Sequence, residues 1–454
     1  MHGVSTLWTS DQIATAAGGA ASASFEASGV TFDSREVEPG DLFIALTGET
    51  TDGHRFVAGA ADKGAAGMLV SQPVAGPHVL VDDTTAALNA LALAARARTS
   101  AKVVGVTGSV GKTGTKEALY AALERSAPGE AHRSVKSYNN HTGVPLSLAR
   151  MPAEARFGVF EMGMNHAGEL AELTRLVRPH AAVVTAIAPA HREFFASDED
   201  IADAKGEIFE GLEPGGTAII PFDSPHRDRL IRAAQPHAAH IVTFGIGEGA
   251  DVRARESMPG PRGTLITAIL ADAELTFTLA LPGAHWVSNA LAVLAAVQAV
   301  GGDLAAAGLA LAEMPGLLGR GERTVIAVDG GQALLIDESY NANPASMAAT
   351  LSSLSTESGR RIAVLGPMRE LGPESASFHL GLAPLIADAR VELAMLVGDE
   401  MAELSTVVPG ADHAPDVASA IKAIQKRIEP GDVILVKGSN SVGLSRLVAA
   451  LKAR

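Results

Sequence analysis

Residues 103–116 read VVGVTGSVGKTGTK, an apolar run that leads into a glycine-rich turn and then into a helical pattern. Gly108 and Gly111 allow backbone N–H groups to converge on phosphate oxygens. Lys112 adds a positive charge, and the Thr113 hydroxyl can ligate Mg²⁺. An ordinary turn between a strand and a helix is the alternative, because such turns are also rich in glycine. The order of strand, turn and helix favours a site for a nucleoside triphosphate.

A carboxylate and an imidazole follow the next apolar runs along the chain. Glu161 ends the run 157–161, and His191 follows the run 181–187. Because the carboxyl ends of parallel strands meet at one edge of a sheet, we expect both side chains beside the phosphate loop. A carboxylate at that edge suits Mg²⁺. Each residue alone could be an ordinary loop residue, but the two together predict metal ligands.

Lys205 interrupts an apolar stripe. The segment 198–212 is expected to be helical, with Ile201, Lys205, Ile208 and Leu212 on one face. A lysine in this place can extend its ammonium group to the edge of the helix. The alternative is a buried lysine with a lowered pKa, which could be chemically modified or serve in catalysis.

The composition narrows the classes of protein. A chain of 454 residues suggests roughly three domains of about 150 residues each. The net charge of −15 argues against a general nucleic-acid or acidic-lipid surface. Without cysteine, disulfides, thiolate metal sites and a cysteine nucleophile are excluded. Since no apolar run approaches the ~18 residues that span a bilayer, we expect a cytoplasmic protein without an integral membrane segment.

The order of expected elements predicts an α/β fold of three domains. Residues 1–99 predict a small mixed α/β domain, 100–314 a central P-loop ATPase-like domain with a mostly parallel sheet, and 315–454 a C-terminal Rossmann-like α/β domain. The segment 314–323 is rich in proline and glycine, which is typical of a hinge. The expected strands are 29–35, 40–46, 67–70, 78–81, 103–107, 157–161, 181–187, 217–221, 240–244, 334–337, 362–365, 393–397 and 433–436, with a helix at 85–98.

These motifs together resemble the Mur ligase family of peptidoglycan precursor synthesis, over essentially the whole chain. The segments that carry the resemblance are 107–113, 161–163, 190–191, 204–209 and 337–344. The general phosphate-loop pattern has a glycine five positions before Gly111, whereas this chain has Val106 there. The phosphate loop of the family also lacks that glycine, which accounts for Val106. Residues 339–344, followed by Ser346 and Met347, are similar to the segment of members that add the dipeptide D-alanyl-D-alanine. Members that add single amino acids carry a histidine-bearing segment there.

The resemblance implies an ATP-dependent amide ligase that acts through an acyl phosphate. Its substrates would be ATP, UDP-N-acetylmuramoyl-tripeptide and D-alanyl-D-alanine, with two Mg²⁺ ions, and the protein is expected to be a monomer. Thr113 and Glu161 would hold one Mg²⁺. His191 would help to hold the second, with Lys205 as a carbamate formed from CO₂. The implied catalytic residues are Lys112, Lys205 and His191.

The resemblance also assigns binding residues in all three domains. The implied ATP-binding residues are Thr107, Gly108, Ser109, Val110, Gly111, Lys112, Thr113, Asn289, Arg320 and Asp337. The implied substrate-binding residues are Ser34, Arg35, Asn139, Asn140, Tyr340, Asn341 and Asn343. Residues 436–443 depart from the family pattern, since they lack the arginine and methionine that often follow the serine. The residues that contact the dipeptide therefore stay open.

Three other functions compete with this one. A sister ligase that adds a single amino acid shares the whole architecture. A folylpolyglutamate synthase shares the ligase core but lacks the dedicated UDP-sugar domain, and the 99 residues that precede the central domain count against it. A P-loop NTPase switch would bind a protein partner and form no new bond. The third residue of the tripeptide, diaminopimelate or lysine, also stays open.

Overall fold

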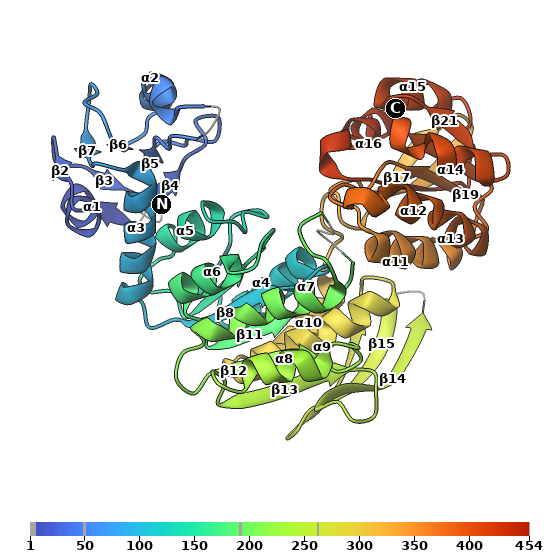
Figure 1. The fold of residues 1–454 in the computed structure, drawn as a ribbon, viewed down its shortest axis with the longest axis horizontal. Coiled ribbons are helices and arrows are strands. Elements are labelled where there is room, and N and C mark those ends of the chain that lie inside the picture. Colours follow the sequence, from blue (N-terminus) through green and yellow to red (C-terminus); the bar gives the residue numbers. More distant parts are fainter. Residues whose placement is uncertain (1–5, 49–50, 190–192, 261–262, 454) are drawn as a thin grey trace.

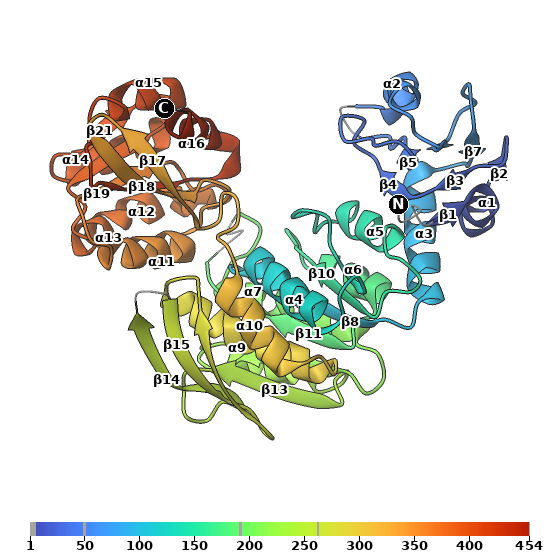
Figure 2. The ribbon, with the colours of Figure 1, turned by 180° about the vertical axis from the view of Figure 1, so that it is seen from behind.

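A computed structural model describes residues 6–48, 51–189, 193–260 and 263–453. The elements gather around three main sheets of five, nine and six strands. The first and last groups lie at opposite ends of the central group, as two views from opposite sides show (Figures 1 and 2). The predicted α/β class with three domains is confirmed.

The N-terminal group contains a five-stranded sheet of order β2-β7-β6-β5-β4 and a separate pair, β1 and β3. Its long helix α3 begins where Asp83 Oδ1 accepts hydrogen bonds from the N–H groups of Thr85 (2.7 Å) and Ala86 (3.1 Å). The elements are β1 (Trp8–Thr9), α1 (Ser10–Ala17), β2 (Ala20–Ala21), β3 (Glu26–Ala27), β4 (Gly29–Thr31), β5 (Asp41–Ile44), α2 (Val57–Asp62), β6 (Gly67–Val70), β7 (His78–Leu80) and α3 (Thr84–Arg98).

The central group contains a nine-stranded sheet of order β16-β15-β14-β13-β12-β11-β8-β10-β9. The strands are β8 (Lys102–Thr107), β9 (Ala131–Arg133), β10 (Phe157–Glu161), β11 (Ala181–Val184), β12 (Thr217–Pro221), β13 (His240–Gly245), β14 (Val252–Gly260), β15 (Gly263–Ile269) and β16 (Glu274–Leu279). The helices are α4 (Lys112–Ser126), α5 (Gly143–Ala149), α6 (Glu169–Val177), α7 (Asp198–Gly206), α8 (Arg227–Ala234), α9 (Ala284–Ala299) and α10 (Leu304–Glu313).

Helices cover both faces of the central sheet. Neighbouring residues of β8 belong to two separate apolar clusters, because alternate side chains of a strand point to opposite faces. Val104 packs with α4, α9 and α10, while Val103 packs with α5, α6, α7 and α8. Strands buried on both faces read as continuous apolar runs, which is why the sequence shows them clearly.

Two features of the central group differ from the sequence-based expectations. β14, β15 and β16 form an antiparallel extension of the parallel strands, and the sequence did not suggest it because much of β14 is exposed and carries polar residues. The helix expected at 198–212 ends at Gly206 and continues as a 3₁₀ turn, Glu207–Gly211. The Glu207 carboxylate there accepts a hydrogen bond from the N–H of Gly168 (2.7 Å), just before α6.

The C-terminal group contains a six-stranded sheet of order β17-β18-β22-β19-β20-β21, parallel except for the pair β17–β18. The four strands expected here are present, and the edge strands β17 and β21 were not foreseen. The elements are β17 (Glu322–Val328), β18 (Gly331–Glu338), α11 (Pro344–Ser355), β19 (Arg361–Leu365), α12 (Ser375–Leu380), α13 (Leu382–Asp388), β20 (Leu393–Val397), α14 (Ala402–Val407), β21 (Asp412–Ala414), α15 (Val417–Ile424), β22 (Val433–Lys437) and α16 (Ser445–Lys452).

The N-terminal group is joined closely to the central one. The Arg96 side chain of α3, 3% exposed, donates hydrogen bonds to the carbonyl oxygens of Val177 and Arg178, both at 2.8 Å. Residues of α5, namely Leu146 and Ala149, belong to the apolar core of the N-terminal group. In both views α5 lies beside α3 (Figures 1 and 2). No helix in the described part of the chain is long and apolar enough to cross a membrane.

Candidate active site

The phosphate loop connects β8 to α4 at the carboxyl edge of the central sheet. Gly108 (φ 151°) and Gly111 (φ 85°) adopt backbone conformations that favour glycine. A Cβ atom on Gly108 would lie 1.9 Å from Thr185 Oγ1, and one on Gly111 would lie 3.0 Å from Asn289 Oδ1. The loop is therefore packed so tightly that side chains at these positions would disrupt it. Asn289 of α9 lies directly against the loop, and its role in binding the nucleotide stays a prediction.

The N-terminus of α4 offers an anion-binding geometry. Lys112 is the first residue of this helix, and the positive end of the helix dipole lies at the loop. Lys112 Nζ donates a hydrogen bond to the Gly108 carbonyl oxygen (2.6 Å), which keeps the ammonium group beside the turn. Desolvation lowers the pKa of Lys112, and the nearby Glu161 carboxylate acts in the opposite direction. Ser109 N–H donates to Ala186 O (2.8 Å), so this loop amide is already used within the protein.

Thr113 and Glu161 form the candidate Mg²⁺ site. Thr113 Oγ1 donates to Glu161 Oε2 (2.9 Å), and Asn139 Nδ2 donates to Glu161 Oε1 (2.7 Å). Glu161 is 1% exposed and Thr113 6%. A hydroxyl and a carboxylate are hard oxygen donors, so the pair fits Mg²⁺. Among the described residues no group of three or more His, Asp or Glu side chains could hold a metal; few protein ligands are typical of Mg²⁺ that is also bound by substrate phosphates.

Lys205 lies in the interior rather than at a helix edge. It is 1% exposed, and its neighbours on the helix, Ile201 and Ala204, belong to the buried cluster under the sheet. Burial, with a smaller contribution from the Lys112 charge, holds the pKa of Lys205 well below its usual value. The uncharged amine is favoured in this environment. The other residue implied for a second metal site, His191, lies outside the described residues.

The segment Ser134 to Asn139, here called the 134–139 loop, borders the candidate Mg²⁺ site. Ser137 Oγ lies 3.4 Å from Thr113 Oγ1 and accepts a hydrogen bond from the Arg320 guanidinium (3.4 Å). Sequence reasoning selected Asn139 but missed Ser137, which no motif marks. Asn140 was also selected, and its Oδ1 accepts from Gly143 N (2.9 Å) at the start of α5.

The C-terminal group contributes residues to the same place. Asn343 Nδ2 donates to the Ser109 carbonyl oxygen (3.4 Å), and the Arg320 guanidinium lies over the Tyr340 ring at 4.3 Å. Asn341 accepts, through its carbonyl oxygen, a hydrogen bond from Lys437 Nζ (3.0 Å). The remaining selected residue of this group, Asp337, is engaged within the hinge: its carboxylate accepts from Gly319 N (3.2 Å) and Ser339 Oγ (2.6 Å).

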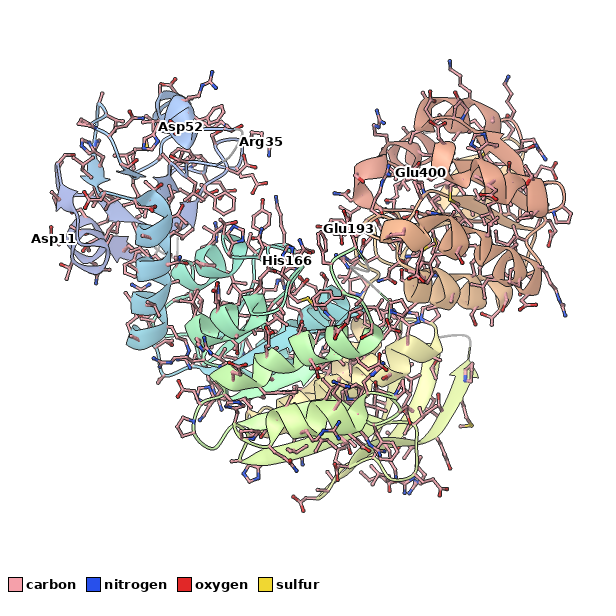
Figure 3. The ribbon with its side chains drawn as sticks, viewed as in Figure 1. Asp11, Arg35, Asp52, His166, Glu193 and Glu400 are labelled. Atoms are coloured by element: carbon pink, nitrogen blue, oxygen red, sulfur yellow. The ribbon has the colours of Figure 1, made fainter. Side chains whose placement is uncertain are left out.

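The two selected residues of the N-terminal group lie on a turn after β4. Arg35 forms an ion pair with Asp33 (2.6 Å) and is itself exposed, and its hydrogen bonds lower the pKa of Asp33 to about 2. The Ser34 carbonyl oxygen accepts from Lys63 Nζ (2.8 Å). Figure 3 places Arg35 at the side of the N-terminal group that faces the C-terminal group. The turn is connected to the 134–139 loop by an ion pair between Glu36 and Lys136.

The fold and the site thus define an α/β protein with a glycine-rich loop of the phosphate-binding type, next to residues of the hinge and of the C-terminal group. The chain belongs to the Mur ligase family. It matches the Mur ligase middle domain over residues 106–297, the Mur ligase, glutamate ligase domain over 319–440, and the Mur ligase family, catalytic domain over 26–107. It is accordingly an ATP-dependent ligase.

Similar proteins cover most or nearly all of the chain. The UDP-N-acetylmuramoyl-tripeptide--D-alanyl-D-alanine ligase of Escherichia coli (strain K12) is 36% identical, over 93% of each chain. A crystal structure of MurF from Acinetobacter baumannii has a TM-score of 0.85 at 31% identity, over 98% of this chain and 99% of that one. MurF ligase from Thermotoga maritima, solved in complex with ADP, has a TM-score of 0.78 at 27% identity, over 94% of this chain and 97% of that one. A folylpolyglutamate synthase from Mycobacterium tuberculosis shares the fold alone. It is 16% identical, with a TM-score of 0.62, over 80% of this chain and 94% of that one.

Proposed function

We propose that this enzyme adds D-alanyl-D-alanine to UDP-N-acetylmuramoyl-tripeptide, with conversion of ATP to ADP and phosphate. The observation that carries the proposal is the hydrogen bond from Asn343 to Ser109 O. It brings the segment 339–344, which resembles that of dipeptide-adding ligases, onto the phosphate loop. Relatives named for this activity cover 93% of the chain, which supports the same substrates here.

The reaction would proceed in two steps. The terminal carboxylate of the tripeptide attacks the γ-phosphorus of ATP, which forms an acyl phosphate and releases ADP. The amine of the dipeptide then attacks the acyl carbon, phosphate leaves, and the nitrogen loses a proton as the amide forms. Lys112 and the N-terminus of α4 would hold the phosphates, so that the protein mainly positions anions and offsets their charge.

Thr113 and Glu161 would hold one Mg²⁺, and Lys205 with His191 would contribute to a second site. Bound Mg²⁺ would neutralise phosphate charge. The lowered pKa of Lys205 supports the proposed carbamate, because the uncharged amine is the form that adds to CO₂: the N–C bond forms, one proton is released, and an anionic carbamate results. The carbamate would replace a buried ammonium group, which is costly in this environment, by an anionic oxygen ligand for the second metal ion.

The three groups of elements would divide the substrates between them. We propose that residues 1–99 bind the UDP-sugar through Ser34 and Arg35, that 100–314 bind ATP, and that 315–454 close over ATP and the dipeptide. Asn139, Asn140, Tyr340, Asn341 and Asn343 would contribute to the substrate side, and Asn289, Arg320 and Asp337 to the ATP side. The nucleotide-linked substrates favour a cytoplasmic location, and we propose a monomer.

The test is phosphate release from ATP and Mg²⁺ with UDP-N-acetylmuramoyl-tripeptide and different acceptors. Release that requires D-alanyl-D-alanine, with a product heavier by that unit, is expected. Release with D-glutamate or L-alanine would instead indicate a sister ligase, and release without any acceptor would indicate an NTPase switch. Thermal stabilisation by UDP-sugars, which bind the folded state, separates the enzyme from a folylpolyglutamate synthase.

A further inference from the structure

Lys116 is a buried cation that the reaction outlined above does not use. It lies in α4, one turn after Lys112, and is 0% exposed. A buried ammonium group is costly unless hydrogen bonds and opposite charge compensate it. Lys116 Nζ lies 2.7 Å from Glu117 Oε1 and donates to the carbonyl oxygens of Lys136 and, at 3.5 Å, Ser134. Two of its partners are thus backbone atoms of the 134–139 loop.

The loop needs such support, because Lys136 has φ 49°. A residue with a side chain adopts this left-handed conformation at a cost, and it persists where the surroundings hold it in place. The ammonium group of Lys116 contacts the carbonyl oxygen of this same residue. It therefore holds the loop at its strained position.

The held loop orients both candidate Mg²⁺ ligands. Ser134 Oγ accepts from the backbone N–H of Glu161 (3.0 Å), and Asn139 Nδ2 donates to its carboxylate (2.7 Å). Ser137 Oγ lies 3.4 Å from Thr113 Oγ1. A shift of the loop would move three side chains that touch these two residues.

The same loop contacts the other two groups of elements. The Tyr138 ring stacks on Phe32 of the N-terminal group, with ring centroids 5.6 Å apart, and Lys136 pairs with Glu36. Ser137 accepts from Arg320 of the hinge (3.4 Å). The loop thus contacts residues of all three groups, and Lys116 is a residue of the central group that holds it in place.

We propose that Lys116 is a positioning residue of the ligase, whose ammonium group fixes the 134–139 loop and thereby orients Thr113 and Glu161 for a metal–nucleotide complex. It would act through the loop, because its ammonium group is bonded to the carbonyl oxygens of Ser134 and Lys136. This assignment rests on the proposed function, because it takes the Thr113–Glu161 pair as the Mg²⁺ site.

The test compares Lys116→Met with the wild type in binding of Mn²⁺, a spectroscopic substitute for Mg²⁺, in the presence of ADP. Electron paramagnetic resonance measures the Mn²⁺ affinity, and calorimetry measures the affinity for ADP without metal. We expect Mn²⁺ binding to weaken about tenfold or more, as for other groups that orient metal ligands, while ADP alone binds within about threefold of the wild type. Lys116→Gln, which keeps a donor NH₂ group without the charge, is expected to have a Mn²⁺ affinity between those of Lys116→Met and the wild type.

Leu123→Ala is the matched control, because Leu123 is a buried residue of the same helix in the apolar cluster. It is expected to lower Tm without changing Mn²⁺ affinity. Unchanged Mn²⁺ affinity in Lys116→Met, or an equal loss in Leu123→Ala, would overturn the assignment. Should Lys116→Met fail to fold, wild-type Mn²⁺ affinity in Lys116→Gln would overturn it, and a weakened one would support it. Failure of the wild type to bind Mn²⁺ with ADP would overturn the proposed function as well.

Discussion

The side-chain amide of Asn343 joins the C-terminal group to the phosphate loop by a hydrogen bond to Ser109 O (3.4 Å). The same side chain begins α11, because its Oδ1 accepts from Ser346 N (2.9 Å) and Ser346 Oγ accepts from Asn343 N (3.0 Å). One residue therefore both caps a helix and joins that helix to the phosphate loop.

The two roles of Asn343 can be separated by substitution. Asn343→Asp keeps a capping oxygen but cannot donate to Ser109 O, so we expect kcat to fall by about tenfold, the equivalent of one hydrogen bond of about 1.4 kcal/mol, with little change in Tm. Asn343→Ala removes both interactions and should lower Tm as well. Steady-state kinetics and thermal unfolding of the pair test this. Wild-type kcat in the Asp variant would show that the contact does not matter for turnover.

Glu161→Gln is predicted to weaken metal binding specifically. The substitution keeps the size of the side chain and removes the charge that we assign to Mg²⁺. We expect the Mg²⁺ concentration for half-maximal rate to rise by about tenfold or more. Titration of the ligase rate with Mg²⁺ measures this, with Glu172→Gln, at an exposed position of α6, as the matched control. Equal Mg²⁺ dependence in both variants would refute the assigned role of Glu161.

Lys205→Ala should abolish most of the activity, and short-chain carboxylates such as acetate or propionate should partly restore it. The reason is that a carboxylate of this size can occupy the space left by the side chain and supply the anionic oxygen that we assign to the carbamate. Rates with and without the added carboxylate measure the rescue. Lys205→Arg introduces a permanent cation and leaves no such space, so its activity should not respond to the added carboxylate. Full activity of Lys205→Ala without rescue would contradict the carbamate proposal.

His132 predicts a pH dependence of stability. Burial lowers its pKa to about 4, although the hydrogen bond to the Ser147 carbonyl oxygen (2.7 Å) acts in the opposite direction. In the unfolded chain the pKa is about 6.5, so between these values the unfolded state binds one proton more and the free energy of unfolding falls as pH falls. Between pH 7 and pH 5 this residue should lower the free energy of unfolding by about 2 kcal/mol.

Urea unfolding of the wild type and His132→Gln at pH 7 and pH 5 measures this effect. The glutamine can still donate to Ser147 O but does not titrate. The variant should therefore lose less stability than the wild type over this range. Equal losses in the two proteins would show that His132 is not the group responsible.

Much of the site follows from local sequence, because a buried parallel strand reads as an apolar run and its last residue reaches the carboxyl edge of the sheet. This reasoning placed Glu161 correctly beside Thr113, and the helical periodicity around Lys205 gave its burial as one of two alternatives. Ser137 and Lys116 were missed, since their roles depend on contacts between segments that share no motif. The burial of the Lys116 ammonium group against carbonyl oxygens of another segment is visible only in the fold.

The apolar core that Trp8 and Leu91 share with Leu146 and Ala149 of α5 affects how the chain unfolds. A fragment that ended at residue 99 would lack Leu146 and Ala149 and would expose the apolar surface that they cover, whereas a fragment that ended near residue 314 would keep this core whole. The first two groups should therefore melt as one cooperative unit. Differential scanning calorimetry should accordingly resolve two transitions, one for this unit and one for the C-terminal group, although the protein has three main sheets.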